Sequence, residues 1–345
     1  MRKNLLFPIF YGILMTSFTV YVVLDTFVIT RVYGAVESTA SAYTASVDES
    51  ETTGSVTIET ETTGTAAAES SSSVKRSKKK SSSSGTAERA SAETAETTAE
   101  TAVSTENTYQ DENISVTLTE YTVNDTAVYV ADVTLSSAEY LKTALAQGLY
   151  GKNVTESTSD MAEDNNAILA INGDYYGAQE KGYVLRNGVL YRSTAAKNQE
   201  DLVIYADGSF QIINESEVTA EELLADGAVQ ILSFGPALVT DGEIAVTASE
   251  EVGQAKSSNP RTAIGVIDDL HYIFVVSDGR TDESEGLSLY ELASFMESLG
   301  AETAYNLDGG GSSTMVFNGT LINNPTSTGN SIKERSVSDI VYIGY

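Results

Sequence analysis

Three short segments of the sequence combine carboxylates, amides and glycines, and the most distinctive is NLDGGGSS at 306–313. An apolar run leads to Asp308, and three glycines and two serines follow it directly. Glycine permits positive φ and close backbone approach, so successive N–H groups can converge on an anion. A carboxylate beside such a loop suits a substrate with a phosphate and an acid-labile bond. The alternative interpretation is a flexible glycine turn between strands.

A second segment, AINGDYYG at 170–177, repeats the arrangement of an apolar run that ends in polar residues and glycine. Asn172 can orient a sugar hydroxyl, and Asp174 can serve as acid, base or ligand. Tyr175 and Tyr176 could stack on a sugar face. The structural alternative is a strand followed by an Asx-type turn, with the tyrosines in the core.

The third segment places Arg261 at the start of an apolar run and Asp278 at the end of the next one. A buried arginine needs a partner, and phosphate or carboxylate groups are the good ones. Arg261 can therefore bind an anionic substrate. It can equally form a structural ion pair with Asp278 or Asp308.

Composition limits the chemistry that these segments can perform. The chain has no Cys and one His, which excludes thiol nucleophiles, disulfides and sites with several histidines. Residues 108–345 hold 11 Lys/Arg and 36 Asp/Glu, a net charge of −25. Such a surface repels nucleic acid and anionic lipid at long range, so no nucleic-acid partner is expected. An anionic substrate would need a local cationic or N–H site.

The elements that position these residues predict an α/β (α+β) domain at 108–345, with a mixed β-sheet and flanking helices. Alternating and β-branched runs predict strands at 127–135, 167–172, 202–206, 262–267, 272–277, 303–307, 315–317 and 337–344. Asn318-Gly319 predicts a hairpin turn. Ser288 with Glu291 is a capping box that predicts a helix ending at Gly300.

Two further helices are expected from the sequence. Ser136 with Glu139 repeats the capping-box pattern, and Gly148 follows as a stop, which predicts a helix between them. A short helix is also expected around 157–163.

The N-terminal residues 1–34 predict a cytoplasmic stub and a transmembrane signal-anchor. No charge occurs from Leu5 to Leu24, about the length that crosses a bilayer core as a helix. Arg2 and Lys3 precede this run, which places the C-terminal bulk outside by the positive-inside rule. A cleaved signal peptide is the alternative. The expected location is the plasma membrane of a bacterial cell, single-pass, with the C-terminal domain extracellular.

Residues 35–107 are rich in Ser, Thr, Ala and Glu and poor in large apolar residues, which predicts a disordered linker. The basic cluster KRSKKK at 75–80 lies within it. Contact with an anionic wall polymer or lipid headgroups is one interpretation, and a solvated charge cluster is the other.

The order of several motifs resembles the phosphodiester glycosidase domain family. The matching segments are AING at 170–173, FGP at 234–236, PRTAIG at 260–265, SDGR at 277–280, GLSL at 286–289 and NLDGGGSS at 306–313. The resemblance covers roughly 160–345. It implies hydrolysis of the bond between a sugar anomeric carbon and a phosphodiester oxygen. Asp174 departs from the small residue that many members carry there.

Carried onto the matching positions, the resemblance implies catalytic and binding residues. The candidate catalytic residues are Asp308, Asp278 and Asp174. The candidate substrate-binding residues are Asn172, Arg261, Gly309, Gly310, Gly311, Ser312 and Ser313. In this hypothesis the glycine N–H groups and Arg261 hold the phosphodiester, while Asp308 or Asp278 attacks the anomeric carbon or activates water.

We therefore expect a membrane-anchored hydrolase of a sugar-1-phosphodiester in an envelope glycan or glycoconjugate. A non-catalytic glycan-binding protein or a surface assembly protein is the alternative. The sequence requires no cofactor. A divalent cation is compatible with the three candidate carboxylates, although their spacing does not demand one.

Overall fold

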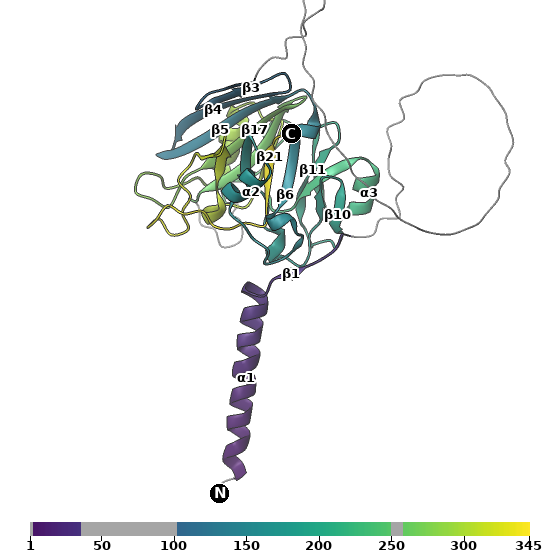
Figure 1. The fold of residues 1–345 in the computed structure, drawn as a ribbon, viewed down its shortest axis with the longest axis vertical. Coiled ribbons are helices and arrows are strands. Elements are labelled where there is room, and N and C mark those ends of the chain that lie inside the picture. The colour runs from purple at the N-terminus through teal and green to yellow at the C-terminus, as the bar shows by residue number, and fades with distance from the viewer. Residues whose placement is uncertain (1–2, 36–101, 250–257) are drawn as a thin grey trace, which may run out of the picture. The chain divides into compact units, whose positions relative to one another are not determined.

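The computed structural model describes residues 3–35, 102–249 and 258–345 (Figure 1). Most of the predicted linker at 35–107 and the whole basic cluster at 75–80 lie outside these described residues. The helices are α1 (Lys3–Phe27), α2 (Thr158–Asp164), α3 (Ala220–Ala225) and α4 (Leu289–Ser298). Single 3-10 turns are η1 (Ala138–Tyr140), η2 (Ala146–Gly148), η3 (Tyr176–Ala178) and η4 (Gly310–Ser312).

Strands make up most of the regular structure. In chain order they are β1 (Arg31–Val32), β2 (Val103–Ser104), β3 (Thr108–Gln110), β4 (Ile114–Val123), β5 (Thr126–Leu135), β6 (Leu141–Leu145), β7 (Gly151–Lys152), β8 (Leu169–Asn172), β9 (Val184–Arg186), β10 (Val189–Arg192), β11 (Glu200–Tyr205), β12 (Phe210–Asn214), β13 (Ala228–Leu232), β14 (Ala237–Thr240), β15 (Glu243–Ile244), β16 (Arg261–Asp268), β17 (His271–Ser277), β18 (Thr303–Asn306), β19 (Met315–Phe317), β20 (Thr320–Leu321) and β21 (Asp339–Ile343).

The strands form three larger sheets and one short pair, β1 with β7. The nine-stranded sheet has the order β15-β14-β18-β16-β17-β5-β4-β3-β2. The two five-stranded sheets are β10-β9-β13-β11-β12 and β20-β19-β8-β21-β6. Non-consecutive strands are neighbours in each sheet, so segments far apart in the chain meet at the strand ends. The domain is a sheet-dominated α+β fold with few helices, as the strand and helix patterns predicted in outline.

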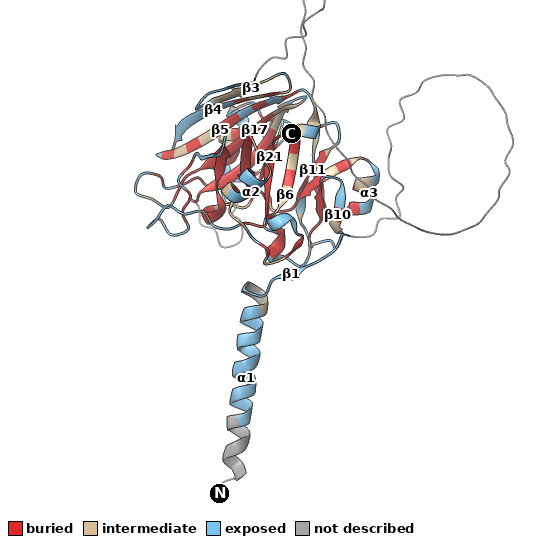
Figure 2. Cartoon of the chain, in the orientation of Figure 1, coloured by how far each residue is buried: buried red, intermediate tan, exposed pale blue. Residues whose placement is uncertain are grey.

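The nine-stranded sheet is covered on both faces at its centre, which explains the continuous apolar run of β17. Tyr272, Phe274 and Val276 point into a core shared with β8, β19 and β21. The alternate residues Ile273 and Val275 point to the other face, where they join the buried side of α4. This alternation follows from the two-residue period of a strand. Figure 2 shows the buried residues concentrated along the strands.

Each of the eight predicted strands overlaps an observed strand. The Asn318-Gly319 hairpin is confirmed, because β19 pairs with β20 and both turn residues have positive φ. The sequence analysis did not identify β2, β3 and β4, which lie at one end of the nine-stranded sheet. This sheet includes Val103, which precedes the predicted boundary at 108.

The prediction for α4 is confirmed in detail, with both hydrogen bonds of the Ser288–Glu291 capping box present. The short helix near 157–163 is also confirmed as α2, which Ser157 caps.

The helix predicted between Ser136 and Gly148 is wrong. One 3-10 turn forms at η1, and the chain then enters β6, where Thr143 pairs with Val341 of β21. Ser137, rather than the predicted Ser136, caps this single turn. β6 in turn places Leu141 in the shared core and completes the sheet edge. Pairing with a distant strand therefore overrides the local preference.

The N-terminal helix α1 is exposed along its described side chains (Figure 2). Within the residues that the structure describes, no helix has both the length and the apolar character needed to cross a membrane. The transmembrane anchor therefore stays a prediction from the sequence.

Candidate active site

The site is built where the ends of β8, β16 and β18 meet, and Asn172 joins them. Its side-chain amide donates to the backbone oxygen of Asp308 at 2.6 Å. Its Oδ1 accepts from the Thr262 hydroxyl at 2.8 Å and from the Thr314 N–H at 3.2 Å. Asn172 is fully buried. This residue, predicted to bind substrate, instead fixes the backbone that carries Asp308.

The glycine loop after Asp308 packs too closely for side chains. Gly310 has a φ of +63°, and a Cβ there would lie 2.7 Å from Arg280 Nη2. A Cβ on Gly311 would collide with the Ser327 hydroxyl. The Gly310 N–H donates to the Pro260 carbonyl at 2.8 Å. The predicted anion-binding nest is revised accordingly, because this N–H is already used within the protein.

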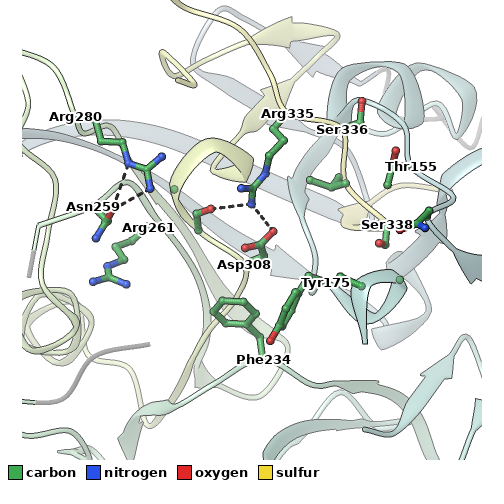
Figure 3. Close-up of a pocket in the computed structure, with 16 residues that line it drawn as sticks. Thr155, Tyr175, Phe234, Asn259, Arg261, Arg280, Asp308, Arg335, Ser336 and Ser338 are labelled. Carbon is green, nitrogen blue, oxygen red and sulfur yellow. Dashed lines mark hydrogen bonds and ion pairs between the residues drawn. The ribbon is translucent and has the colours of Figure 1, made fainter. Parts of the chain in front are cut away.

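Asp308 lines a pocket of about 450 Å³ together with Arg261, Arg280 and Arg335 (Figure 3). Among the described residues that line it, Asp308 is the one carboxylate. Three guanidinium groups thus surround a single acid, in a domain segment with a net charge of −25. The local excess of positive charge makes this pocket suitable for an anion.

The Asp308 carboxylate is held by two side chains at the same oxygen. The Ser312 hydroxyl donates to Oδ2 at 2.7 Å, and Arg335 Nη2 lies 2.9 Å from Oδ2. Arg335 Nε also donates to the Ser312 hydroxyl at 2.9 Å. Burial raises the pKa of Asp308 above its ordinary value, and the Arg335 charge and the Ser312 hydrogen bond offset part of this effect. Its Oδ1 has neither of these partners.

Arg261 and Arg280 come from segments on either side of the β16–β17 hairpin. Arg261 is buried, and its Nε donates to the Leu287 carbonyl at 2.8 Å. Arg280 has a left-handed backbone with a φ of 64° and donates to Asn259 Oδ1 at 3.0 Å through Nη2. Burial, and then the charge of Arg335, lower the pKa of Arg280. The charge of Arg335 therefore acts on Arg280 across the pocket.

Asp174, a predicted catalytic residue, lies outside the pocket lining in a closed ion-pair group. Its Oδ2 is 2.7 Å from Arg186 Nη2, and the same nitrogen is 2.7 Å from Asp339 Oδ2. Asp174 also accepts from the backbone N–H groups of Tyr176 and Ser233. Its oxygens are thus occupied by the protein, so we remove Asp174 from the proposed catalytic group.

Asp278 is likewise held by the protein rather than presented to the pocket. Its Oδ1 accepts from the Asn324 N–H at 2.8 Å and from the Asn323 amide at 3.2 Å, and its Oδ2 accepts from the Asn324 amide at 3.0 Å. It anchors the loop after β20, and we revise its role to a structural one.

The predicted binding residues divide into two groups. Arg261, Gly309 and Gly310 line the pocket. Gly311, Ser312 and Ser313 are buried behind the loop, where Ser312 supports Asp308. Their assignment to direct substrate binding is therefore revised.

Two arginines were missed by the sequence analysis, Arg280 and Arg335. Arg280 directly follows the Ser277-Asp278-Gly279 segment. Basic residues are rare in 108–345, which holds only 11 of them, and this rarity was the signal that could have identified Arg280. Arg335 precedes β21, in a stretch without a recognisable pattern. Only the folding of that stretch over η4, where the Arg335 N–H donates to the Gly311 carbonyl, brings it to Asp308.

An aromatic corner also borders the pocket. The rings of Tyr175 and Phe234 meet edge to face, with centroids 4.9 Å apart and planes at 72°. Burial raises the pKa of Tyr175, and the charges of Asp308 and Asp174 raise it further. The hydroxyl therefore stays protonated, and the corner is uncharged.

Among the described residues, no three His, Cys, Asp or Glu side chains form a group that could hold a metal ion. The compatibility with a divalent cation noted from the sequence remains untested.

Comparison with known proteins identifies the class to which this fold and pocket belong. Residues 165–344 match the model of the phosphodiester glycosidase family, and the chain belongs to that family. The resemblance inferred from the motifs is confirmed.

Individual relatives agree with this assignment. The chain is 31% identical over 201 residues to the SPbeta prophage-derived uncharacterized protein YomE of Bacillus subtilis. This alignment covers 57% of the present chain and 31% of YomE. It is 29% identical over 187 residues to mouse N-acetylglucosamine-1-phosphodiester alpha-N-acetylglucosaminidase, covering 49% of this chain and 35% of the enzyme. The chain thus spans about a third of the length of these relatives.

A solved structure shares the fold. The catalytic domain of the zebrafish N-acetylglucosamine-1-phosphodiester alpha-N-acetylglucosaminidase superimposes with a TM-score of 0.54 at 22% identity, covering 67% of this chain and 83% of that domain.

Proposed function

We propose that this protein hydrolyses the bond between a sugar anomeric carbon and a phosphodiester oxygen. The observation that carries the proposal is the pocket in which Asp308 is surrounded by Arg261, Arg280 and Arg335. A phosphodiester carries one negative charge, and guanidinium groups match its oxygens with paired N–H donors. A carboxylate beside them can reach the anomeric carbon of the same ligand.

The roles follow from the contacts. Arg261 and Arg280 hold the phosphodiester. Arg335 and Ser312 hold Asp308 through Oδ2, and we assign Oδ1, which neither of them contacts, as nucleophile or as base toward water. The raised pKa makes Asp308 a stronger base than an exposed aspartate.

A single carboxylate is chemically sufficient for this substrate class. Most glycosidases use two carboxylates, one of which protonates a poor leaving group. The phosphate monoester that leaves here is a good leaving group, and the arginines neutralise the charge that develops on it. This fits the presence of one carboxylate among the described residues of the pocket lining.

The test is incubation of the full chain with a panel of sugar-1-phosphodiesters, including wall-polymer fragments, with and without chelator. Release of free sugar and phosphomonoester is the expected result, and its loss in Asp308→Asn identifies the acid. Asp132→Asn is the matched control, because the Asp132 carboxylate also contacts a nitrogen-bearing side chain, His271, but lies on the exposed side of β5. Undiminished turnover in Asp308→Asn would contradict the assignment. Glycan binding without product would favour the binding-protein alternative.

We further propose that the N-terminal segment anchors the enzyme in the plasma membrane, with the catalytic domain acting on an envelope glycan outside. The support is the uncharged run from Leu5 to Leu24 behind Arg2 and Lys3. Membrane fractionation of cells, followed by protease treatment from outside, tests both parts. A chain recovered in the soluble fraction, or protected from external protease, would contradict them.

A further inference from the structure

The short strand β1, which follows α1 closely in the chain, pairs with a strand of the β-sheet domain. Arg31 of β1 lies opposite Lys152 of β7 in an antiparallel register. The Tyr33 N–H donates to the Tyr150 carbonyl at 2.8 Å. Backbone pairing therefore joins the N-terminal segment to a part of the domain that lies more than a hundred residues further along the chain.

Aromatic packing supports this pairing. The Tyr33 ring lies 5.9 Å from the Tyr150 ring, with the two planes at 53°. Tyr150 in turn stacks on Tyr176 at 5.3 Å and lies 5.0 Å from the Tyr191 ring. Aromatic pairs at such distances attract each other beyond the effect of burying their surface. The surface that receives β1 thus offers apolar contact as well as hydrogen bonds.

Gly151, between the paired residues of β7, leaves room for the incoming strand. A Cβ on Gly151 would collide with the Arg31 carbonyl, and it would lie 2.8 Å from the Val154 side chain. Gly151 is not among the glycines with positive φ, so its backbone conformation does not itself require glycine. The close approach of β1 and the packing of Val154 account for the missing side chain.

The contacts of the N-terminal segment extend to the pocket around Asp308. Asn153 lines this pocket, and its side-chain amide donates to the Ile29 carbonyl at 3.0 Å. The Asn153 N–H donates to the carbonyl of Gly177, which also lines the pocket, at 3.2 Å. One residue therefore contacts both the N-terminal segment and the candidate active site.

From these contacts we infer that β7 is the docking strand for residues 29–33, and that this pairing holds the domain directly at the end of α1. Residues 28–30 connect α1 to β1. At about 3.5 Å per residue, they allow roughly 14 Å between Phe27 and Arg31. The long segment 36–101 therefore does not set the distance between α1 and the domain. With the anchoring proposed above, the pocket is kept near the membrane surface.

Engineered disulfides test the docking in the full chain, because the sequence contains no Cys. Opposite residues of an antiparallel pair have Cα atoms about 5.5 Å apart when they exchange hydrogen bonds, which a disulfide can span. The chain with Arg31→Cys and Lys152→Cys should form an intramolecular disulfide about tenfold faster than the chain with Arg31→Cys and Glu120→Cys. Glu120 is exposed on β4 and pairs with Tyr129, so it provides the unpaired control. Non-reducing electrophoresis of the monomer measures both rates.

Two proline substitutions distinguish strand pairing from mere proximity. Tyr33→Pro removes the N–H that bonds Tyr150, so it should slow disulfide formation between positions 31 and 152 about tenfold. Val32→Pro is the matched control, because in an antiparallel pair the N–H next to a bonded one points away from the partner strand. It should leave the rate nearly unchanged. If Tyr33→Pro unfolds by circular dichroism, Gly151→Ala is the second variant, and it should also slow the reaction.

Equal rates for the two cysteine pairs, or equal losses from the two prolines, would overturn the docking. The disulfide measurement requires neither turnover nor a membrane. A chain that cleaves no sugar-1-phosphodiester, or that is recovered in the soluble fraction, would therefore contradict the proposed function and anchoring while the docking stands.

Discussion

Two arginine–carboxylate groups lie near the ends of β8 and β18, and they differ in whether a ligand can reach them. In the first, Arg186 pairs with Asp174 and Asp339, and its side chain is 2% exposed. In the second, Arg335 pairs with Asp308, and its side chain is 48% exposed.

The closed group is buried and shares one cation between two carboxyl groups. Arg186 contacts both carboxylates, the carbonyls of Leu185 and Ile231, and the face of the Tyr176 ring. It joins β9 to the start of β21 and to the loop after β8. A buried ion pair of this kind is costly to break, because one partner remains charged without compensation.

The open group faces a pocket whose described lining residues include more cations than carboxylates. Arg335 and Arg280 face one pocket, whose described lining residues include a single carboxylate, and burial together with the charge of Arg335 lowers the pKa of Arg280. Similar residue types are therefore buried in one place and open to the pocket in the other, and we propose that only the open group binds a ligand. The following variants test this contrast.

The largest effect on activity should come from replacing Asp308, and replacing Asp174 in a separate variant provides the comparison. Asp308→Asn should reduce kcat by about three orders of magnitude, because the amide neither attacks nor accepts a proton. The free energy of unfolding should not fall, since burial already disfavours the ionised form of Asp308. Asp174→Asn should retain kcat and lower stability. Steady-state kinetics and urea unfolding of both variants test this prediction. If Asp174→Asn lost kcat and Asp308→Asn lost only stability, the catalytic and structural roles of the two aspartates would have to be exchanged.

Arg186→Met should lower the free energy of unfolding by about 3 to 5 kcal/mol, because Asp174 and Asp339 lose their shared cation. Urea denaturation followed by circular dichroism measures the change. Adding Asp339→Asn to this variant should restore part of the loss, since one uncompensated carboxyl is removed. A double variant no more stable than the single one would show that the ion pairs are not the source of the effect.

Arg280→Gln should raise KM for a sugar-1-phosphodiester by about ten- to a hundredfold, as expected for losing charge-assisted hydrogen bonds to the ligand. Stability should change little, because the Gly310 loop keeps its other contacts. Kinetics at two salt concentrations provide the measurement. An unchanged KM would place the phosphodiester elsewhere.

A further prediction concerns the dependence of stability on pH. Burial, partly offset by Arg186, raises the pKa of Asp339 from 3.8 to about 8. The folded state then binds more protons than the unfolded state between these values, so stability should fall as pH rises through this interval, by at most ~1.4 kcal/mol per pH unit. Urea midpoints at several pH values should show a shallower decline in Asp339→Asn. If the urea midpoint of Asp339→Asn changed with pH as steeply as that of the wild type, other groups would be responsible for the pH dependence of stability.

Local sequence signals predicted those parts of the fold that depend on neighbouring residues. The Ser288–Glu291 capping box placed α4, and the apolar runs placed β16, β17 and β18. The helix predicted after Ser136 failed, because the pairing partner of β6 lies about 200 residues away in β21 and no local pattern reports it.

For the site, the sequence by itself determined that Asp308 follows a buried strand and precedes a tightly packed glycine loop. Tertiary structure decided which candidates face the pocket. Asp174 and Asp278 have equally suggestive positions after strands, but Arg186 and the asparagines at 323 and 324 occupy their oxygens. Arg280 and Arg335 reach Asp308 only through the folding of separate loops. The end of a strand determines the backbone position of a side chain. The groups that contact this side chain come from segments far away in the sequence, so local patterns do not predict them.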